Sequence, residues 1–98
     1  MNLQVELFTV PGCATCGQAI AVLERALADP ALAAAVSWRR VDVVAELDRA
    51  VGLGILATPA IVIGDELVFT GVPAVASLRL ALQARLPGAG AGTRERGT

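Results

Sequence analysis

The sequence predicts a single α/β domain with a four-stranded mixed sheet and helices on both of its faces. Short apolar runs typical of strands alternate with segments whose apolar residues recur at helical spacing. These segments follow the order β-α-β-α-β-β-α. The opening β-α-β unit makes its two strands parallel, and the last two strands form an antiparallel hairpin. A length of 98 residues with 55% apolar residues suits one modest core.

The first half of the chain contains four predicted elements, each bounded by a turn or capping signal. They are a strand over residues 3–10, a helix over 14–28, a short helical turn through residue 35 and a strand over 36–43. Pro11 and Gly12 end the first strand because both residues disfavour a continuing ladder. Asp29 followed by Pro30 is the pattern of an N-cap and the first residue of a helix.

The second half adds a short helix, a hairpin and a last helix. The expected bounds are a helix over 45–53, strands over 60–63 and 67–70, and a helix that opens at Pro73 and runs to residue 86. Gly52 or Gly54 ends the short helix in a left-handed conformation, and the loop from Gly64 to Glu66 pairs the two strands antiparallel. We therefore expect residues 1–86 to form the domain and the Gly-rich residues 87–98 to form a disordered tail.

Composition excludes several kinds of function. The net charge is −1, which argues against a nucleic-acid binder held by phosphate contacts. The chain has no His and no Lys, so a histidine base, a histidine metal ligand and a Schiff-base lysine are all excluded. We see no secretory signal and no apolar run of membrane-spanning length, and we expect a cytoplasmic monomer with no membrane partner.

The only two cysteines, Cys13 and Cys16, stand where the first strand gives way to a helix. In a reducing compartment this spacing indicates redox chemistry or metal binding rather than a structural staple. Unpaired amides at a helix start stabilise a thiolate at Cys13 and lower its pKa below about 8.5. Cys16, one turn further along an apolar stripe, is expected to be more buried. We therefore assign Cys13 as the attacking thiol and Cys16 as the resolving one.

The cysteine pair has two other interpretations. A pair of thiolates can bind copper, zinc or part of an iron–sulfur cluster, and a metal-binding or metal-delivery module is the alternative function. A closed tetrahedral site needs two more ligands, however, and no further Cys or His exists. Heavy-metal-associated domains also usually carry Met where this chain has Pro11. In the third interpretation the cysteines are incidental residues of a binding scaffold.

Two segments, "FTVPGCATC" and "GILATPAIVIGDELVFTG", carry a resemblance to the thioredoxin–glutaredoxin superfamily, and in particular to its small redox proteins. The resemblance covers residues 3–86 and implies a thioredoxin-like fold and a thiol–disulfide oxidoreductase with a redox-active disulfide and no other cofactor. It also implies a cis bond before Pro59, a Thr58 backbone that pairs with a substrate strand, and a Gly71 beside the substrate groove. We expect Pro11 to belong to an apolar rim around the reactive sulfur. Thr15, exposed in the motif turn, either hydrogen-bonds a thiolate or simply suits a first helical turn, and we favour the second role.

Several positions depart from that family's pattern. Leu7 stands where thioredoxin carries a buried Asp, and strand alternation aims the neighbouring Glu6 at the opposite face. The absence of Lys argues against glutathione, so protein disulfides and an unidentified reductase are the expected partners. The adjacent Arg39 and Arg40 could attract acidic partners, although we favour a simple solvated strand end.

Overall fold

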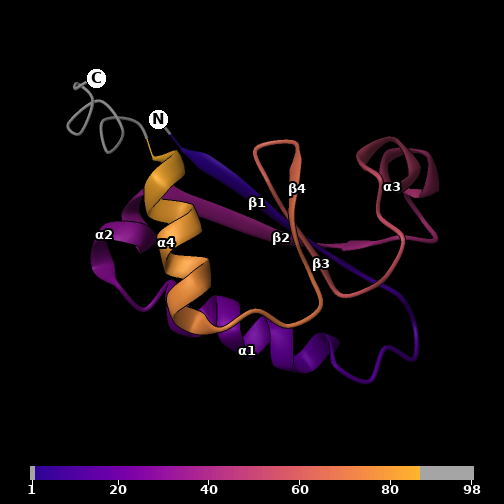
Figure 1. Ribbon diagram of the computed structural model, residues 1–98, viewed down its shortest axis with the longest axis horizontal. Coiled ribbons are helices and arrows are strands. Elements are labelled where there is room, and N and C mark those ends of the chain that lie inside the picture. The colour runs from indigo at the N-terminus through magenta and orange to yellow at the C-terminus, as the bar shows by residue number, and fades with distance from the viewer. Residues whose placement is uncertain (1, 87–98) are drawn as a thin grey trace.

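The structure is a computed structural model and describes residues 2–86 (Figure 1). It contains the predicted four strands and four helices in the predicted order. Their bounds are β1 Leu3–Thr9, α1 Cys16–Ala26, α2 Pro30–Ala35, β2 Val36–Asp42, α3 Leu47–Leu53, β3 Ala60–Ile63, β4 Glu66–Thr70 and α4 Val75–Arg85. The predicted α/β class and the mixed four-stranded sheet are thereby confirmed. The tail expected over 87–98 lies outside the described residues.

The strands form one sheet in the order β2-β1-β3-β4. β1 pairs with β2 in parallel and with β3 antiparallel, and β3 pairs antiparallel with β4. Strand β1 is therefore central, which agrees with its run of buried residues. The β3–β4 ladder shifts register between Ile61 and Val62, where an irregularity interrupts the pairing.

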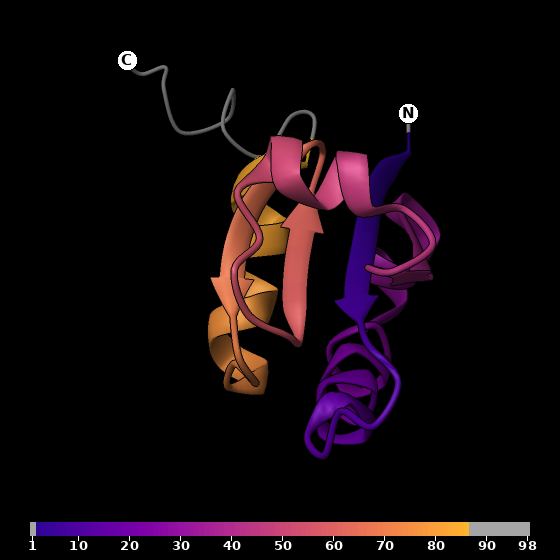
Figure 2. The same ribbon diagram turned by 90° about the vertical axis from the view of Figure 1, so that its right-hand side faces the viewer.

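Alternation along β1 separates two cores. Val5 and Leu7 point to one face and pack in the larger cluster, which includes Leu23 of α1 and Leu82 of α4. Phe8 points to the other face and packs in a smaller cluster with α3. Figure 2 shows α3 crossing over the strands, apart from α1 and α4. Helices thus cover both faces of the sheet, as predicted.

Local signals explain where the short elements begin and end. The Asp29 carboxylate accepts a hydrogen bond from the Ala31 N–H at 3.0 Å, which confirms the predicted cap of α2. Gly54 ends α3 with a φ of +80°, in the left-handed region that glycine adopts without steric cost. Gly64 and Asp65 both have positive φ and form a two-residue hairpin turn. Glu66, predicted to be in the loop, therefore belongs to β4.

Three helix starts differ from the prediction, and one of them is α4, which begins at Val75 rather than at Pro73 because Ala74 still has an extended backbone. Helix α3 begins at residue 47 rather than 45 because the Asp42 carboxylate accepts the Val44 N–H at 2.9 Å, which keeps the chain in a turn after β2. Helix α1 begins at Cys16 rather than at residue 14. Within residues 2–86, no helix combines the length and apolar content needed to cross a bilayer.

Candidate active site

The register of the sheet brings one end of every strand to a single edge. Thr9 at the end of β1 lies opposite Asp42 at the end of β2. On the other side, Phe8 pairs with Ala60 at the start of β3, and Ala60 pairs with Thr70 at the end of β4. The cysteine segment follows β1, Thr58-Pro59 precedes β3, and Gly71 follows β4. The three motifs, although distant in sequence, therefore meet at this edge.

A tight turn connects β1 to the cysteines. The Cys13 N–H donates to the Val10 carbonyl oxygen at 3.2 Å. Pro11 and Gly12 occupy the two central positions, and Gly12 has a φ of +79°, the combination expected in a type II turn. Both central residues are exposed, so the turn lies at the surface of the protein.

Cys13 and Cys16 form a disulfide, with a Sγ–Sγ distance of 2.10 Å and a Cα–Cα distance of 5.5 Å. The structure is therefore the oxidised form of the pair. Cys16 is only 3% exposed and belongs to the buried side of α1, whereas Cys13 is half-buried. As predicted, Cys16 is the more buried of the two.

The position of the pair relative to α1 differs from the prediction. Cys16 is the first residue of the helix rather than one turn inside it, because the turn at Pro11 and Gly12 holds Cys13 ahead of the helix. Within residues 2–86, the backbone N–H groups of Cys16 and Gly17 have no hydrogen-bond acceptor. Thr15 occupies the N-cap position, is exposed, and makes no side-chain capping bond. The helix start thus keeps free donors directly beside the disulfide.

The Thr58-Pro59 peptide bond is cis, as the family resemblance predicted. Pro59 is buried, and its carbonyl oxygen accepts the Gly71 N–H at 2.7 Å. Gly71 has a φ of +91°, a backbone conformation that glycine adopts without steric cost, at the bend where the chain leaves β4. This hydrogen bond joins the segment that precedes β3 to the segment that follows β4.

The only buried carboxylate in the described part of the chain lies on the far face of the sheet. Glu6 accepts hydrogen bonds from both Arg49 and Arg39, the latter at 2.7 Å. The Arg49 hydrogen bonds hold the pKa of Glu6 below its ordinary value, with Arg39 adding to the effect against the opposing influence of burial. On the Cys16 face, Leu7 occupies the neighbouring position and offers no proton acceptor.

Sequence reasoning missed two features of this region. The ion pairs that join Glu6 to Arg49 and Arg49 to Asp65 link three distant segments, and no local pattern identifies them. The second is a cavity at the ends of β1 and β2 that includes Thr9 and Asp42. The sequence did contain a signal for this cavity, because Thr9 and Asp42 are polar residues near the ends of two strands predicted to be parallel.

Metal binding gains no support from this arrangement. Residues 2–86 contain no group of three or more Cys, His, Asp or Glu side chains placed to hold a metal ion. Both sulfurs are joined to each other in the disulfide. A C-x-x-C disulfide at the start of a helix, on this fold, defines the class: a dithiol–disulfide redox protein.

Comparison with known proteins gives the family. The sequence pattern described as the thioredoxin domain matches residues 1–83. The chain is 33% identical over 85 residues to a thioredoxin of Methanocaldococcus jannaschii, covering 87% of this chain and 98% of that protein. It is 30% identical over 73 residues to a probable thioredoxin of Methanothermobacter marburgensis, covering 74% and 84%. The chain belongs to the thioredoxin domain family and is a thiol–disulfide oxidoreductase.

Solved structures show the same fold at lower sequence identity. A thioredoxin from Halobacterium salinarum superposes with a TM-score of 0.68 at 17% identity, covering 85% of this chain and 74% of that one. The oxidised mitochondrial thioredoxin 3 of Saccharomyces cerevisiae gives 0.67 at 20% identity, covering 84% and 77%. These likenesses establish the thioredoxin fold.

Proposed function

We propose that Cys13 is the nucleophile and Cys16 the resolving thiol in the reduction of protein disulfides. In the reduced protein the Cys13 thiolate attacks one sulfur of a substrate disulfide, forms a mixed disulfide and releases the first substrate thiolate, which takes a proton from water. The Cys16 thiolate then attacks the Cys13 sulfur and releases the second substrate thiol. Two electrons pass to the substrate, and the Cys13–Cys16 disulfide remains.

The unequal burial of the two cysteines is the observation that carries this assignment. A substrate sulfur must approach the attacking thiol in line, and Cys13 is the partly exposed member of the pair while Cys16 is 3% exposed. The unpaired amides at the start of α1 favour a thiolate beside them. Cys13 therefore combines access with stabilisation, whereas the buried Cys16 suits an attack on the neighbouring Cys13 sulfur once a mixed disulfide has formed.

Five further residues are proposed to shape the substrate groove around Cys13. They are Pro11, Thr15, Thr58, Pro59 and Gly71. Thr58 is half-buried at the sheet edge, where its backbone can pair with an extended segment of the substrate. Nearby, Leu56 is 97% exposed and Val72 is 38% exposed. An apolar rim of this kind fits a protein surface better than a small polar thiol.

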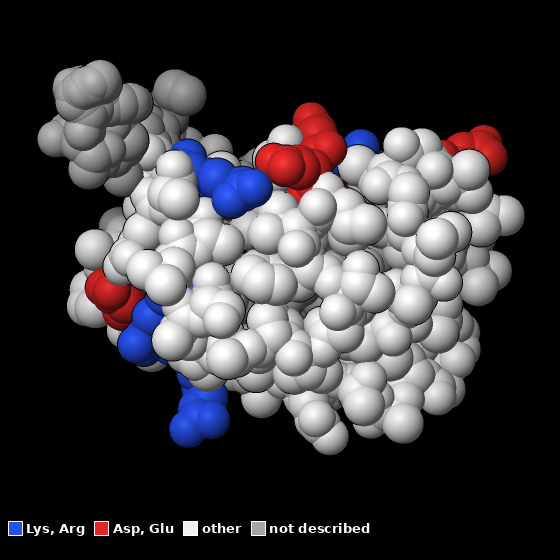
Figure 3. Space-filling view, in the orientation of Figure 1, with Lys and Arg blue, Asp and Glu red and all other residues white. Residues whose placement is uncertain are grey.

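The charge distribution supports the same class of substrate. In Figure 3 the charged side chains gather along the upper rim and at the lower left. The lower right, where the turn between β1 and α1 runs, is uncharged on the face shown. We propose that a separate reductase returns the disulfide to the dithiol, that glutathione is a poor donor, and that the protein acts as a cytoplasmic monomer without nucleic-acid or membrane partners.

The assignment is tested with single-cysteine variants. Cys16→Ser is expected to accumulate mixed disulfides with protein substrates, because the resolving step is removed, whereas Cys13→Ser forms none. Non-reducing electrophoresis after reaction with oxidised insulin measures both. In addition, iodoacetamide at pH 6 should alkylate Cys13 in the reduced protein faster than it alkylates a free peptide thiol.

The opposite outcomes are equally definite. Trapping by Cys13→Ser and not by Cys16→Ser would reverse the roles of the two thiols. No insulin reduction by the wild-type protein with dithiothreitol, together with alkylation of Cys13 at the rate of a free peptide thiol, would reject the function. Elemental analysis after anaerobic purification checks the metal alternative, since a stoichiometric metal that blocks both thiols would favour it.

A further inference from the structure

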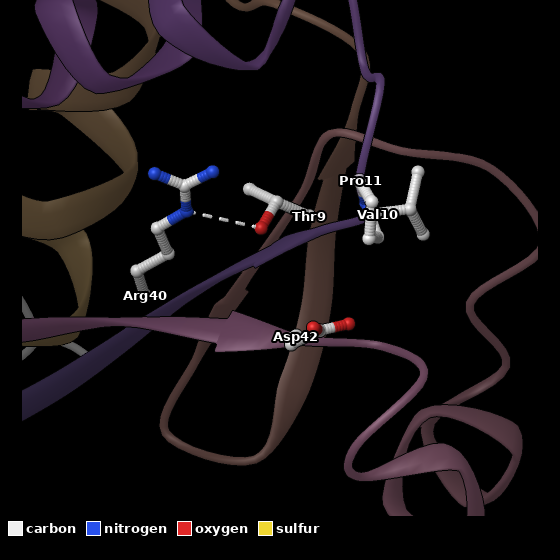
Figure 4. Close-up of a pocket in the computed structure, with 5 residues that line it drawn as sticks. All are labelled: Thr9, Val10, Pro11, Arg40 and Asp42. Carbon is white, nitrogen blue, oxygen red and sulfur yellow. Dashed lines mark hydrogen bonds between the residues drawn. The ribbon is translucent and has the colours of Figure 1, made fainter.

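A cavity of about 360 Å³ lies beside the turn that carries Cys13 (Figure 4). It is open to solvent and is lined by Thr9, Val10, Pro11, Arg40 and Asp42. The strand ends of β1 and β2 form one part of its wall, and the first half of the cysteine turn forms another. The Val10–Cys13 hydrogen bond closes that turn, so two residues of the cavity wall, Val10 and Pro11, lead directly into Cys13.

Arg40 supplies the positive charge in this cavity. Its Nε donates a hydrogen bond to the Thr9 hydroxyl oxygen at 3.2 Å, and Thr9 is 3% exposed (Figure 4). This bond orients the guanidinium group but uses only one of its five N–H donors. Within residues 2–86, no carboxylate lies within ion-pair distance of Arg40.

The neighbouring Arg39 differs sharply from Arg40. Arg39 contacts Glu6 at 2.7 Å and Glu46 at 3.6 Å, so its charge is already paired on the other face of the sheet. The two arginines look alike in sequence, but alternation along β2 sends one to an ion-pair network and the other to the cavity. Only Arg40 therefore keeps unused donors next to the cysteine turn.

The remaining walls restrict what the cavity can accept. Asp42 also lines it, and its Oδ1 accepts the Val44 N–H at 2.9 Å, which holds that carboxylate at the turn after β2. Val10 and Pro11 provide an apolar wall suited to methylene groups. A carboxylate on a short aliphatic stem matches this set, with Arg40 binding its oxygens in a charge-assisted contact and Asp42 left to accept a backbone N–H of the same segment.

We propose that this cavity is a specificity subsite that binds an Asp or Glu side chain of the substrate protein close to the disulfide attacked by Cys13. The proposal rests on the proposed function, because it assumes a protein substrate seated at the cysteine turn. Within residues 2–86 the Arg40 guanidinium forms no ion pair, so its charge is available to a substrate carboxylate. One cation can therefore bias which disulfides are reduced.

The test compares disulfide-bonded peptides that differ only by Glu, Gln or Lys beside the disulfide. We expect the wild-type protein to reduce the Glu peptide with a kcat/KM roughly 3- to 10-fold above the Gln peptide, an effect limited because Arg40 is exposed. Arg40→Gln should bring this ratio to about 1, and Arg40→Glu should shift the preference to the Lys peptide. Arg25→Gln, which removes the same charge from the last turn of α1, is the matched control and should keep the Glu preference.

Thr9 is proposed as a positioning residue for Arg40, and Thr9→Val tests it. Thr9→Val should lower the ratio of kcat/KM for the Glu peptide to that for the Gln peptide, although Arg40 is still present. Arg40→Lys should keep only part of the wild-type ratio, because a lysine ammonium lacks the planar fork of a guanidinium group. A change in thermal stability without a change in this ratio would show a merely structural role for Thr9.

A neutral small disulfide, bis(2-hydroxyethyl) disulfide, separates the subsite from the redox chemistry. We expect all four Arg40 and Thr9 variants to reduce it at the wild-type rate. An unchanged Glu preference in Arg40→Gln, with normal reduction of the neutral disulfide, overturns the subsite alone. Failure of the wild-type protein to reduce either the neutral disulfide or the peptides overturns the proposed function and the subsite that depends on it.

Discussion

Two glycines flank the cysteine pair and have different backbone conformations. Gly12 has a φ of +79° in the turn that precedes Cys13, whereas Gly17 lies in the first turn of α1. A Cβ atom added at either position would meet nothing within 4 Å. Any difference between substitutions at the two sites therefore reflects the backbone and not steric contact.

We expect alanine to have opposite effects at these two glycines. Gly12→Ala should lower the free energy of unfolding by about 1 kcal/mol, because a side chain at positive φ is strained. Gly17→Ala should raise it by up to about 1 kcal/mol, because alanine is the better helix former and reduces the entropy of the unfolded chain. Urea denaturation of the oxidised proteins measures both. A stabilised Gly12→Ala variant would contradict the turn geometry.

At the scale of elements, one ion-pair network connects α3 to the sheet. Glu6 on β1 accepts hydrogen bonds from Arg49 on α3 and from Arg39 on β2, and Arg49 also contacts Asp65 in the hairpin turn at 2.8 Å. These contacts raise the pKa of Arg49 and lower that of Glu6. The face of the sheet opposite the cysteines thus has a charged group at its centre, and docking of α3 supplies the second of its two arginine partners.

This network predicts a specific pH dependence of stability. Folding lowers the pKa of Glu6, so the ionised carboxylate stabilises the fold. This stabilisation is fully present above the pKa of the unfolded chain, about 4.5, and is lost as pH falls through the lower pKa of the folded protein. Glu6→Gln should therefore lower the free energy of unfolding by about 2 kcal/mol at pH 7. This difference between wild type and variant should shrink as pH falls below about 4.5. Urea midpoints at pH 7, 5 and 3 measure it. A gap that stays constant across this range would contradict an ionised Glu6 in the folded protein.

At the scale of the whole molecule, the larger core joins α1 and α4 against one face of the sheet. Leu23 of α1 and Leu78 and Leu82 of α4 are each fully buried there. Cys16 is also on the buried side of α1, so packing between α1 and α4 helps to hold the helix that begins with this cysteine against the sheet. In contrast, Leu80 on the same helix α4 is 67% exposed.

Leu78 and Leu80 provide a matched test of this packing. Leu78→Ala should lower the free energy of unfolding by about 2–5 kcal/mol, because it removes buried methyl groups and leaves a cavity. Leu80→Ala should change it by less than about 0.5 kcal/mol, because leucine and alanine have similar helix propensities and the side chain is in water. Thermal and urea unfolding give both values. Equal losses at the two positions would mean that α4 does not pack as described.

Most of the fold could be predicted because its signals are local. The apolar spacing, the Asp29-Pro30 cap and the breaks at Pro11 and Gly12 each act within a few residues, and they located all eight elements to within about two residues. The helix start was less accurate at α4, and so were those at α1 and α3. There a turn competes with the first helical residues, and its strength depends on hydrogen bonds from neighbouring segments such as that between Asp42 and Val44.

By itself, the sequence determined the class of the fold, the order of its elements and the pair of cysteines, since periodicity, turn residues and spacing are properties of the local chain. The unequal burial of the two cysteines was also predicted, because Cys16 is on the apolar stripe of the helix and Cys13 lies ahead of it. Only the tertiary structure decided which distant side chains meet. Pairing of Leu3–Thr9 with Val36–Asp42 set Arg39 beside Glu6, brought Arg40 to Thr9 and formed the cavity beside the cysteine turn. Strand register is set by packing of the whole sheet and not by any one segment.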